Sequence, residues 1–410
     1  MDRTMDNNFN ADVTNYASMV MTSANVLFFN ARVHGELEAL GQHKAILALE
    51  AMGFPAQLHG DQVCIKTHFG ALGNQYHLRP AYIRFLCDKM RSCGGLPTVA
   101  ETCGMGAPHS GGIYGGRCSE EEYLSCALMH GFTRETMGAP LIMLDGPFGQ
   151  DIVEAPVKGL HFNRVLVAGR LREFQHLVLA THFKGHGAAG FGGTIKNLGI
   201  GCVSKGGKAE AHHSKAMHIA QEKCAGDSCS ICINYCMNRA ITREGGTLKR
   251  DTSKCKRCRI CHAKCPNHVF YSDDVDDFQF IEQFVDNAKG VVDFVGAGRI
   301  YYLNYVIDVT PNCDCSSVSD LPFVSDVGIL ASRDPVAIDQ AAVDLVHHMP
   351  GTPGSVATEK TPPKQTDWFS YIYAEDGRTV PDTRWQHQLE HAEKIGLGSR
   401  KYQLIRMDEG

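Results

Sequence analysis

The sequence predicts an α/β fold built on a mostly parallel sheet, with a small cysteine-rich module inserted into it. Apolar, β-rich runs alternate with helical patterns over residues 1–215, which favours a parallel sheet covered on both faces. Cysteines then become dense between His218 and Tyr271, after which the strand–helix pattern resumes. We therefore expect a first α/β part at 1–217, an insert at 218–272, and a second α/β part with a C-terminal extension at 273–410.

Eight apolar runs are the expected strands, namely Val26–Asn30, Gln62–Lys66, Pro97–Ala100, Leu141–Leu144, Arg164–Ala168, Leu177–Ala180, Arg299–Ile307 and Val327–Ala331. The expected helices are Glu36–Met52, Ala81–Cys93, Phe278–Ala288 and Pro335–His347. The second helix follows Pro80, a favourable residue in a first turn, and ends at two glycines. The Pro-, Thr- and Gly-rich segment Gly351–Thr366 predicts a loop before a short helical piece.

Bulk composition excludes several classes of protein. With 410 residues, 43% of them hydrophobic and 21% charged, the chain has an ordinary globular composition. Its net charge of -5 does not show the excess of positive charge that is typical of nucleic-acid-binding proteins. No apolar run approaches the roughly 20 residues that span a bilayer. Because no export signal is visible, we expect a cytoplasmic protein with reduced thiols. Its 17 cysteines then indicate metal ligands and core thiols, not disulfides.

Two closely spaced cysteine runs carry the strongest signal. The spacing Cys255-x2-Cys258-x2-Cys261-x3-Cys265-Pro266 is that of bacterial ferredoxins, in which three thiolates hold one 4Fe–4S cluster and the fourth crosses to another. Upstream, Cys224-x4-Cys229-x2-Cys232-x3-Cys236 repeats the pattern with a longer first spacing. The crossing rule gives one cluster Cys224, Cys229, Cys232 and Cys265, and the other Cys236, Cys255, Cys258 and Cys261. A pair of zinc sites is the alternative.

A basic run borders the second motif and comprises Lys249, Arg250, Lys254, Lys256, Arg257 and Arg259. It is either a solvated face or a dock for an acidic redox partner protein.

Polar side chains follow four of the expected strands. Ligands in open α/β sheets bind beyond the carboxyl ends of the strands, where this sequence places His68, Glu101, His182 and Asp308. A single histidine at a strand end is commonly a packing residue. Polar side chains at four strand ends together predict a binding site.

The richest of these segments is glycine-rich and runs from His186 to Gly199. Its glycines let backbone N–H groups approach an anion, and a helix start near Thr194 adds a positive end. Lys196 then supplies a charge or a reactive amine. A tight turn with glycines for close packing is the alternative.

The sequence Cys313-Asp314-Cys315 has three interpretations: ligation of a soft metal, a redox pair of thiols, or buried small side chains. The acids Asp308 and Asp314 favour the metal over the redox pair. We expect core or surface thiols at the remaining cysteines, which are Cys64, Cys87, Cys93, Cys103, Cys118, Cys126 and Cys202. His212 and His213 receive no role.

On these motifs the chain resembles an iron–sulfur family known as domain of unknown function 362. The matching segments are Lys66–Gly70, His182–His186, Asn197–Gly199, Cys313–Cys315 and Val327–Asp339. The resemblance implies an α/β domain with an inserted ferredoxin-like module. The stretch from His186 to Lys196 is also similar to lactate racemase, with one glycine shifted by one place. In that family the lysine carries a nickel-pincer nucleotide, which implies that Lys196 anchors a nucleotide-type cofactor.

The leading interpretation is an iron–sulfur oxidoreductase that passes electrons through two 4Fe–4S clusters to a substrate or an organic cofactor at the strand ends. The predicted catalytic residues are His182, His186 and Lys196. The predicted cofactor-binding residues are Lys66, His68, Lys184, Gly190, Gly192, Gly193, Asn197, Cys313, Asp314 and Cys315. The cofactor is an anionic or nucleotide-type molecule or a further metal. The alternatives are an electron carrier, a metal-delivery protein, and a non-redox enzyme with structural clusters.

Overall fold

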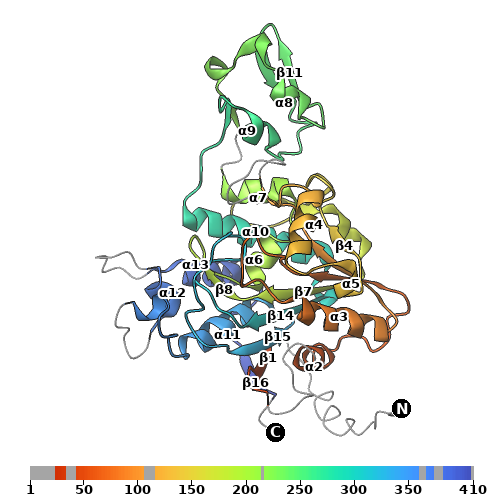
Figure 1. Cartoon of the computed structure of the whole chain (residues 1–410), viewed down its shortest axis with the longest axis vertical. Coiled ribbons are helices and arrows are strands. Elements are labelled where there is room, and N and C mark those ends of the chain that lie inside the picture. The colour runs from red at the N-terminus through yellow and green to blue at the C-terminus, as the bar shows by residue number, and fades with distance from the viewer. Residues whose placement is uncertain are drawn as a thin grey trace.

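The computed structural model describes residues 24–33, 43–105, 116–213, 217–359, 366–373 and 382–407. Its centre is an eight-stranded sheet with the strand order β16-β1-β15-β14-β7-β2-β3-β4 (Figure 1). Five strand pairs are parallel, and the two antiparallel pairs both involve β15. The predicted α/β class with a mostly parallel sheet is confirmed. The sheet strands are β1 (Asn25–Asn30), β2 (Gln62–Lys66), β3 (Leu96–Glu101), β4 (Leu141–Met143), β7 (His176–His182), β14 (Ile300–Val306), β15 (Gly328–Ser332) and β16 (Gln403–Arg406).

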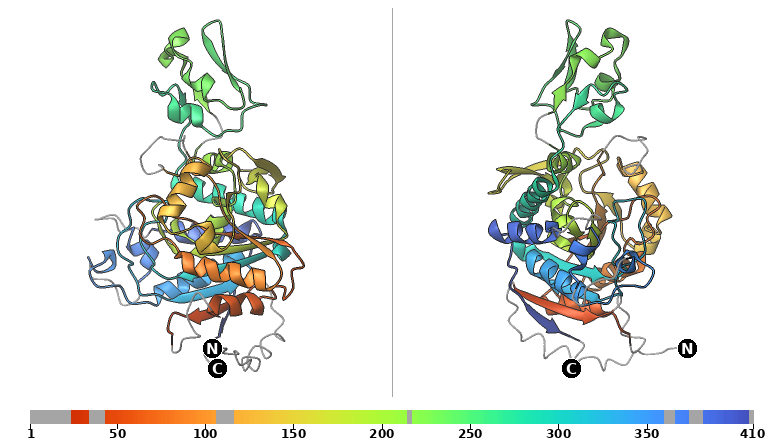
Figure 2. Two further views of the ribbon diagram at one scale, coloured as in Figure 1. Left: turned by 45° about the vertical axis from the view of Figure 1, so that its right-hand side comes forward. Right: turned by 90° about the vertical axis from the view of Figure 1, so that its left-hand side faces the viewer.

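Helices cover both faces of the sheet (Figure 2). Apolar side chains of α6, α10, α11 and α13 form one core, and those of α2, α3 and α4 form a second core on the other face. None of the helices in the described ranges is long and apolar enough to cross a membrane. The helices of this part are α2 (Ala45–Ala51), α3 (Pro80–Ser92), α4 (Glu120–Met129), α5 (Arg134–Met137), α6 (Thr194–Gly199), α7 (Lys205–His212), α10 (Asp277–Val295), α11 (Pro335–His347), α12 (Trp368–Tyr371) and α13 (Arg384–Lys394).

Two expected elements differ from the structure. The expected strand Arg164–Ala168 is β6, but it lies outside the main sheet in a hairpin with β5 (Ile152–Pro156) and packs against α10. The expected helix Glu36–Met52 is described only from α2 onward, because residues 34–42 lie outside the described ranges.

Residues 217–275 form a lobe that stands beyond one end of the main body (Figure 1). The strand β10 (His218–Ile219) pairs with β13 (Phe270–Tyr271), so the two ends of the lobe lie together at its base. Ile241, Leu248 and Phe270 belong to a small core of its own. The predicted insert limits 218–272 stay a prediction. The lobe also contains β11 (Ile241–Glu244), β12 (Thr247–Arg250), α8 (Ile231–Asn234) and α9 (Ile260–Lys264).

The helix α6 can approach α10 closely because it ends in glycine. A Cβ atom at Gly199 would lie 1.9 Å from the carbonyl oxygen of Phe284 on α10.

We therefore predict that Gly199→Ala lowers the free energy of unfolding by about 3 kcal/mol, because the backbone of α6 or of α10 would have to shift to make room for the methyl group. Gly298→Ala is the matched control, because a Cβ there meets nothing within 4 Å, and we expect a change under about 0.5 kcal/mol. Chemical denaturation of both variants measures the difference, and equal midpoints would contradict this account of the helix crossing.

Candidate functional site

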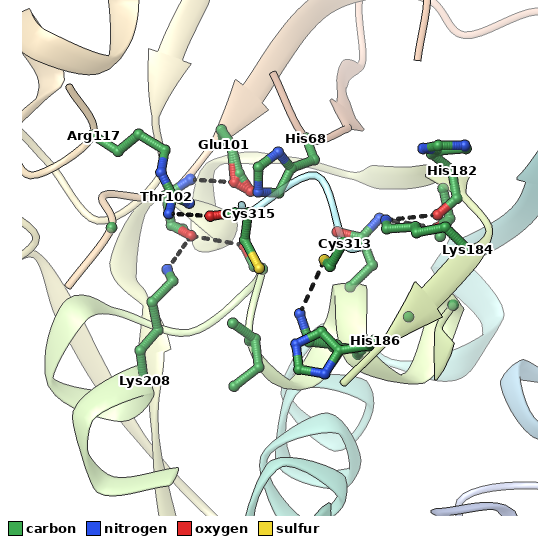
Figure 3. Close-up of a pocket in the computed structure, with 18 of the residues that line it drawn as sticks. His68, Glu101, Thr102, Arg117, His182, Lys184, His186, Lys208, Cys313 and Cys315 are labelled. Carbon is green, nitrogen blue, oxygen red and sulfur yellow. Dashed lines mark hydrogen bonds between the residues drawn. The ribbon is translucent and has the colours of Figure 1, made fainter. Parts of the chain in front are cut away.

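A cavity of about 100 Å³ lies at the carboxyl ends of the central parallel strands (Figure 3). His68 follows β2, Glu101 ends β3, and His182 ends β7. Cys313 and Cys315 come from the loop after β14. Because these strands are neighbours and parallel, the four predicted strand ends do meet at one edge. The space is enough for a small organic molecule or a few waters.

Cationic side chains dominate the wall of the cavity. Among the residues that the structure describes, four lysine or arginine side chains line it, against the single carboxylate of Glu101. Each of the four is at least nine-tenths buried, so their charges act at short range through little solvent. The cavity therefore favours an anionic ligand. The four cations are Arg117, Lys184, Lys196 and Lys208.

The fully buried carboxylate of Asp314 fixes the loop that carries the two thiols. It lies 2.8 Å from His182 Nδ1 and 3.1 Å from Lys184 Nζ. Burial alone would raise the pKa of Asp314, but His182 and Lys184 outweigh it and hold the pKa below its ordinary value. Asp308 pairs instead with Arg79 at 2.6 Å. Neither carboxylate lines the cavity, and the preference for a metal over a redox pair stays a prediction.

The two thiols lie beside a lysine and a histidine. Lys196 Nζ is 3.5 Å from Cys313 Sγ. The hydrogen bond from Cys315, with Lys196 adding to it, holds the pKa of Cys313 well below its ordinary value despite burial. Burial and the nearby Lys196 keep the pKa of His186 well below its ordinary value, so its imidazole is neutral. The site thus offers a thiolate and a neutral imidazole.

His68 presents a hydrogen-bond donor to the cavity. Its Nδ1 accepts the backbone N–H of Gly70 at 2.8 Å, and burial keeps its pKa well below the ordinary value. The neutral ring therefore carries its proton on Nε2.

His182 does not have the geometry of the proton carrier that we predicted. Its Nδ1 faces Asp314, its Nε2 lies 2.8 Å from the carbonyl oxygen of Ile307, and in Figure 3 its ring is turned away from the cavity. Because both nitrogens have partners, His182 helps to position the loop, and its predicted role as a proton carrier is not supported by this geometry.

Lys66, predicted to bind a cofactor, lies behind the cavity wall. It is fully buried, pairs with Glu101, and donates to Asn197 Oδ1 at 2.9 Å. Asn197 lines the cavity, but its amide is engaged by Lys66 and Thr181. Lys66 uses its three N–H groups within the wall, whereas the Asn197 amide has a second N–H besides the one that it donates to Thr181.

Packing explains most of the glycine-rich segment. Gly190 has φ +76°, and a Cβ there would lie 2.6 Å from the backbone nitrogen of Trp385. The backbone N–H groups of Thr194 and Ile195 donate to the carboxylate of Asp339, each at 2.8 Å. A Cβ at Gly193 would collide with the same carboxylate. The helix start that we expected to bind an exogenous anion is therefore occupied. Gly192 and Gly193 still line the cavity.

Three basic lining residues were missed by sequence reasoning: Arg117, Lys208 and His212. Lys208 and His212 are four residues apart on α7, so they share one face of that helix. That spacing was visible in the sequence. Arg117, which donates to the carbonyl oxygen of Cys315 at 2.8 Å, follows no strand and gave no signal.

The cysteines of the lobe lie in two groups of four, and the assignment of each group to one cluster by the crossing rule stays a prediction. Cys224, Cys229, Cys232 and Cys265 line one small pocket. Burial and the neighbouring thiols of Cys258, Cys255 and Cys236 raise the pKa of Cys261 to about 12, so these four lie together as well. The other seven cysteines outside the cavity are all buried, as expected for core thiols, and are Cys64, Cys87, Cys93, Cys103, Cys118, Cys126 and Cys202.

Lys66 and Lys196 differ in what their removal leaves behind. Lys66→Met leaves the buried carboxylate of Glu101 without its ion-pair partner, so we predict a loss of about 3–5 kcal/mol in the free energy of unfolding. Lys196→Met keeps the stem beside a thiol that can take up a proton, and we expect a loss below about 1.5 kcal/mol. Chemical denaturation of both variants tests this order, and equal losses would contradict the two placements.

Comparison with known proteins finds similarity to a protein family, to a curated protein and to a solved structure. The family model described as domain of unknown function (DUF362) matches residues 63–344. The pyruvate synthase subunit PorD of Thermotoga maritima is 32% identical over 75 residues, which cover 17% of this chain and 74% of that subunit. The lactate racemase apoprotein of Thermoanaerobacterium thermosaccharolyticum shows a weak structural likeness, with a TM-score of 0.35 and 12% identity over 88% of this chain and 76% of that one.

The family match covers the sheet strands from β2 to β15 and every strand end that faces the cavity. This chain belongs to the family described as domain of unknown function (DUF362).

Proposed function

We propose that this chain is an iron–sulfur oxidoreductase whose lobe binds two 4Fe–4S clusters and whose cavity binds the anionic substrate or cofactor to be reduced or oxidised. The observation that carries the proposal is the gathering of eight cysteines into two quartets in a lobe beside a buried cationic cavity. When bound, the clusters would supply electrons one at a time.

The residues of the lobe fit such clusters. Four thiolates per cluster are available in each set, and each set has a hydrogen-bond donor to sulfur. Gln150 Nε2 lies 3.4 Å from Cys258 Sγ, and Arg243 Nη2 lies 3.7 Å from Cys224 Sγ. Two zinc sites would use the same residues, and acid-labile sulfide distinguishes the two possibilities.

The helix α7 joins the lobe to the cavity. Glu210 on this helix pairs with Arg257, next to Cys258, and the carbonyl oxygen of Lys256 lies against Gly206. Lys208 and His212 of the same helix line the cavity. One side of α7 therefore contacts the segment of Cys258, and another side lines the cavity. A helix with its side chains is about 10–12 Å across, so of the two cysteine sets the one that contains Cys258 would lie next to the cavity.

Within the cavity, Lys184, Lys196, Lys208 and Arg117 would hold an anionic group. His68 would donate a hydrogen bond through Nε2 to the same ligand. A simple electron carrier has no use for such a buried cationic cavity, so we favour the enzyme. The likeness to a subunit of pyruvate synthase is consistent with work beside a redox partner protein.

The basic run that borders the second cysteine motif gives limited support to an acidic partner. Lys249 pairs with Glu244, Lys254 with Asp251, and Arg257 with Glu210. Half of the six cations are therefore already compensated within the chain.

Anaerobically prepared protein should contain about eight irons and eight acid-labile sulfides per chain, because eight thiolates hold two 4Fe–4S clusters. Cys258→Ser should lower both contents, whereas Cys93→Ser, which changes a buried thiol at the end of α3, should leave them unchanged. Iron, sulfide and zinc analysis gives the result. Stoichiometric zinc without sulfide would refute the two clusters.

The two sulfur-directed hydrogen bonds predict separate effects on the two clusters. Hydrogen bonds to sulfur help to set cluster potentials, and loss of a donor destabilises the reduced, more negative cluster. Gln150→Leu should therefore lower one midpoint potential, and Arg243→Leu should lower the other. Redox titration followed by electron paramagnetic resonance resolves them. If both substitutions shift the same signal, the assignment of the cysteine sets is wrong.

A further inference from the structure

One histidine and two cysteines of the cavity meet with the spacing of metal ligands. A ring nitrogen of His186 and the Sγ atoms of Cys313 and Cys315 all lie within 4.8 Å of one another. His186 ends β8 (Lys184–His186), which pairs with β9 (Gly190–Gly192), and the cysteines follow β14. The fold therefore brings together three soft or borderline donors from segments more than 120 residues apart.

We propose that His186, Cys313 and Cys315 bind one divalent metal ion of the zinc or ferrous type, with a fourth position open to the cavity. Thiolate and imidazole together suit these ions. Tetrahedral bonds of about 2.3 Å to sulfur and about 2.0–2.1 Å to nitrogen place the donor atoms about 3.5–3.8 Å apart. Donors within 4.8 Å of one another need to close by only about 1 Å, which side-chain rotation can supply.

The loop that carries the two thiols is held from several sides. Arg117 donates to the carbonyl oxygen of Cys315 at 2.8 Å, and the Ser316 N–H donates to that of Cys313 at 2.8 Å. The hydroxyl of Tyr373 donates to the carbonyl oxygen of Pro311. Asp314, between the two ligands, is anchored by His182 and Lys184. Such support around ligands is typical of metal sites, because it fixes the ligands before the metal arrives.

Contacts of the ligands change when a metal binds. The hydrogen bond from Cys315 to Cys313 is lost as both thiols give up their protons. A metal on Nε2 of His186 leaves the Ala188 N–H on Nδ1 at 3.2 Å, and a metal on Nδ1 replaces that long bond at little cost. Lys196 Nζ lies 3.5 Å from Cys313 Sγ and can turn toward the fourth position. With Lys208 and Arg117 also lining the cavity, the ligand expected in that position is a small carboxylate. The inference deepens the proposed function, since it names what the cavity holds.

The metal can be tested on the full chain with its clusters by using cobalt(II) as a probe. X-ray absorption at the cobalt edge is blind to cluster iron. We expect one cobalt per chain with two sulfur ligands, one nitrogen ligand and a further light ligand. Cys313→Ser, Cys315→Ser and His186→Gln should each weaken cobalt binding at least tenfold and leave iron and sulfide contents unchanged. Cys93→Ser should bind cobalt as the unaltered chain does.

Acetate is the probe for the open position. Its addition should change the light-atom shell of the cobalt spectrum in the unaltered chain, and Lys196→Met should need at least tenfold more acetate for the same change.

Three results would overturn the inference. The first is a cobalt ion that has only sulfur ligands, or that the Cys313→Ser variant binds as well as the unaltered chain does. Either finding would place the cobalt on the cysteines of the lobe. The second is a reversible disulfide between Cys313 and Cys315, seen as a loss of two hydrogens by mass spectrometry, in a chain that binds no cobalt. The third is no cobalt binding at all. Absence of iron and sulfide in a chain that still binds cobalt at these residues would instead refute the proposed clusters and support the metal site.

Discussion

The buried carboxylate of Asp339 determines where the cavity lies. From α11 it accepts the first two N–H groups of α6 at 2.8 Å each, and the amide of Asn304 on β14 at 2.7 Å. Thr194 completes the network by donating to Asn304 Oδ1 at 2.8 Å. Burial raises the pKa of Asp339 to about 6, yet three donors compensate its charge. One side chain thus ties two helices to a central strand and sets the position of Lys196.

The same network explains why the glycine-rich segment was only partly understood from its sequence. Strand-helix alternation and apolar runs predicted the sheet, because those features are local. The role of Gly193 depends on a carboxylate nearly 150 residues away, and that of Gly190 on Trp385 from α13. Glycines that admit a ligand and glycines that admit a neighbouring segment look alike in a sequence. The placement of β6 outside the sheet likewise depends on α10, a long-range contact.

The candidate site was predictable where strand topology decides it. Parallel strands must end at one edge, so His68, His182 and the two thiols of the loop after β14 come together as expected. Which strand-end residue faces the cavity depends on rotamers and partners. Lys66 pairs with the opposite charge of Glu101, and the ring of His182 makes a hydrogen bond with Asp314, because buried charged and polar groups need partners. Arg117 was beyond prediction, since its segment follows no strand.

Charge balance constrains what the cavity holds when the protein works. Glu101 is already compensated by Lys66, and Asp314 by His182 and Lys184. Lys196, Lys208 and Arg117 remain. Lys196 lies beside the sulfur of Cys313, Lys208 donates to the Thr102 hydroxyl and the carbonyl oxygen of Val203, and Arg117 donates to the carbonyl oxygen of Cys315. The buried Asp145 offsets part of the charge of Lys208, and the thiolate favoured at Cys313 offsets part of the charge of Lys196. Buried positive charge that is left over is unfavourable, so the wall of the cavity favours a bound anion.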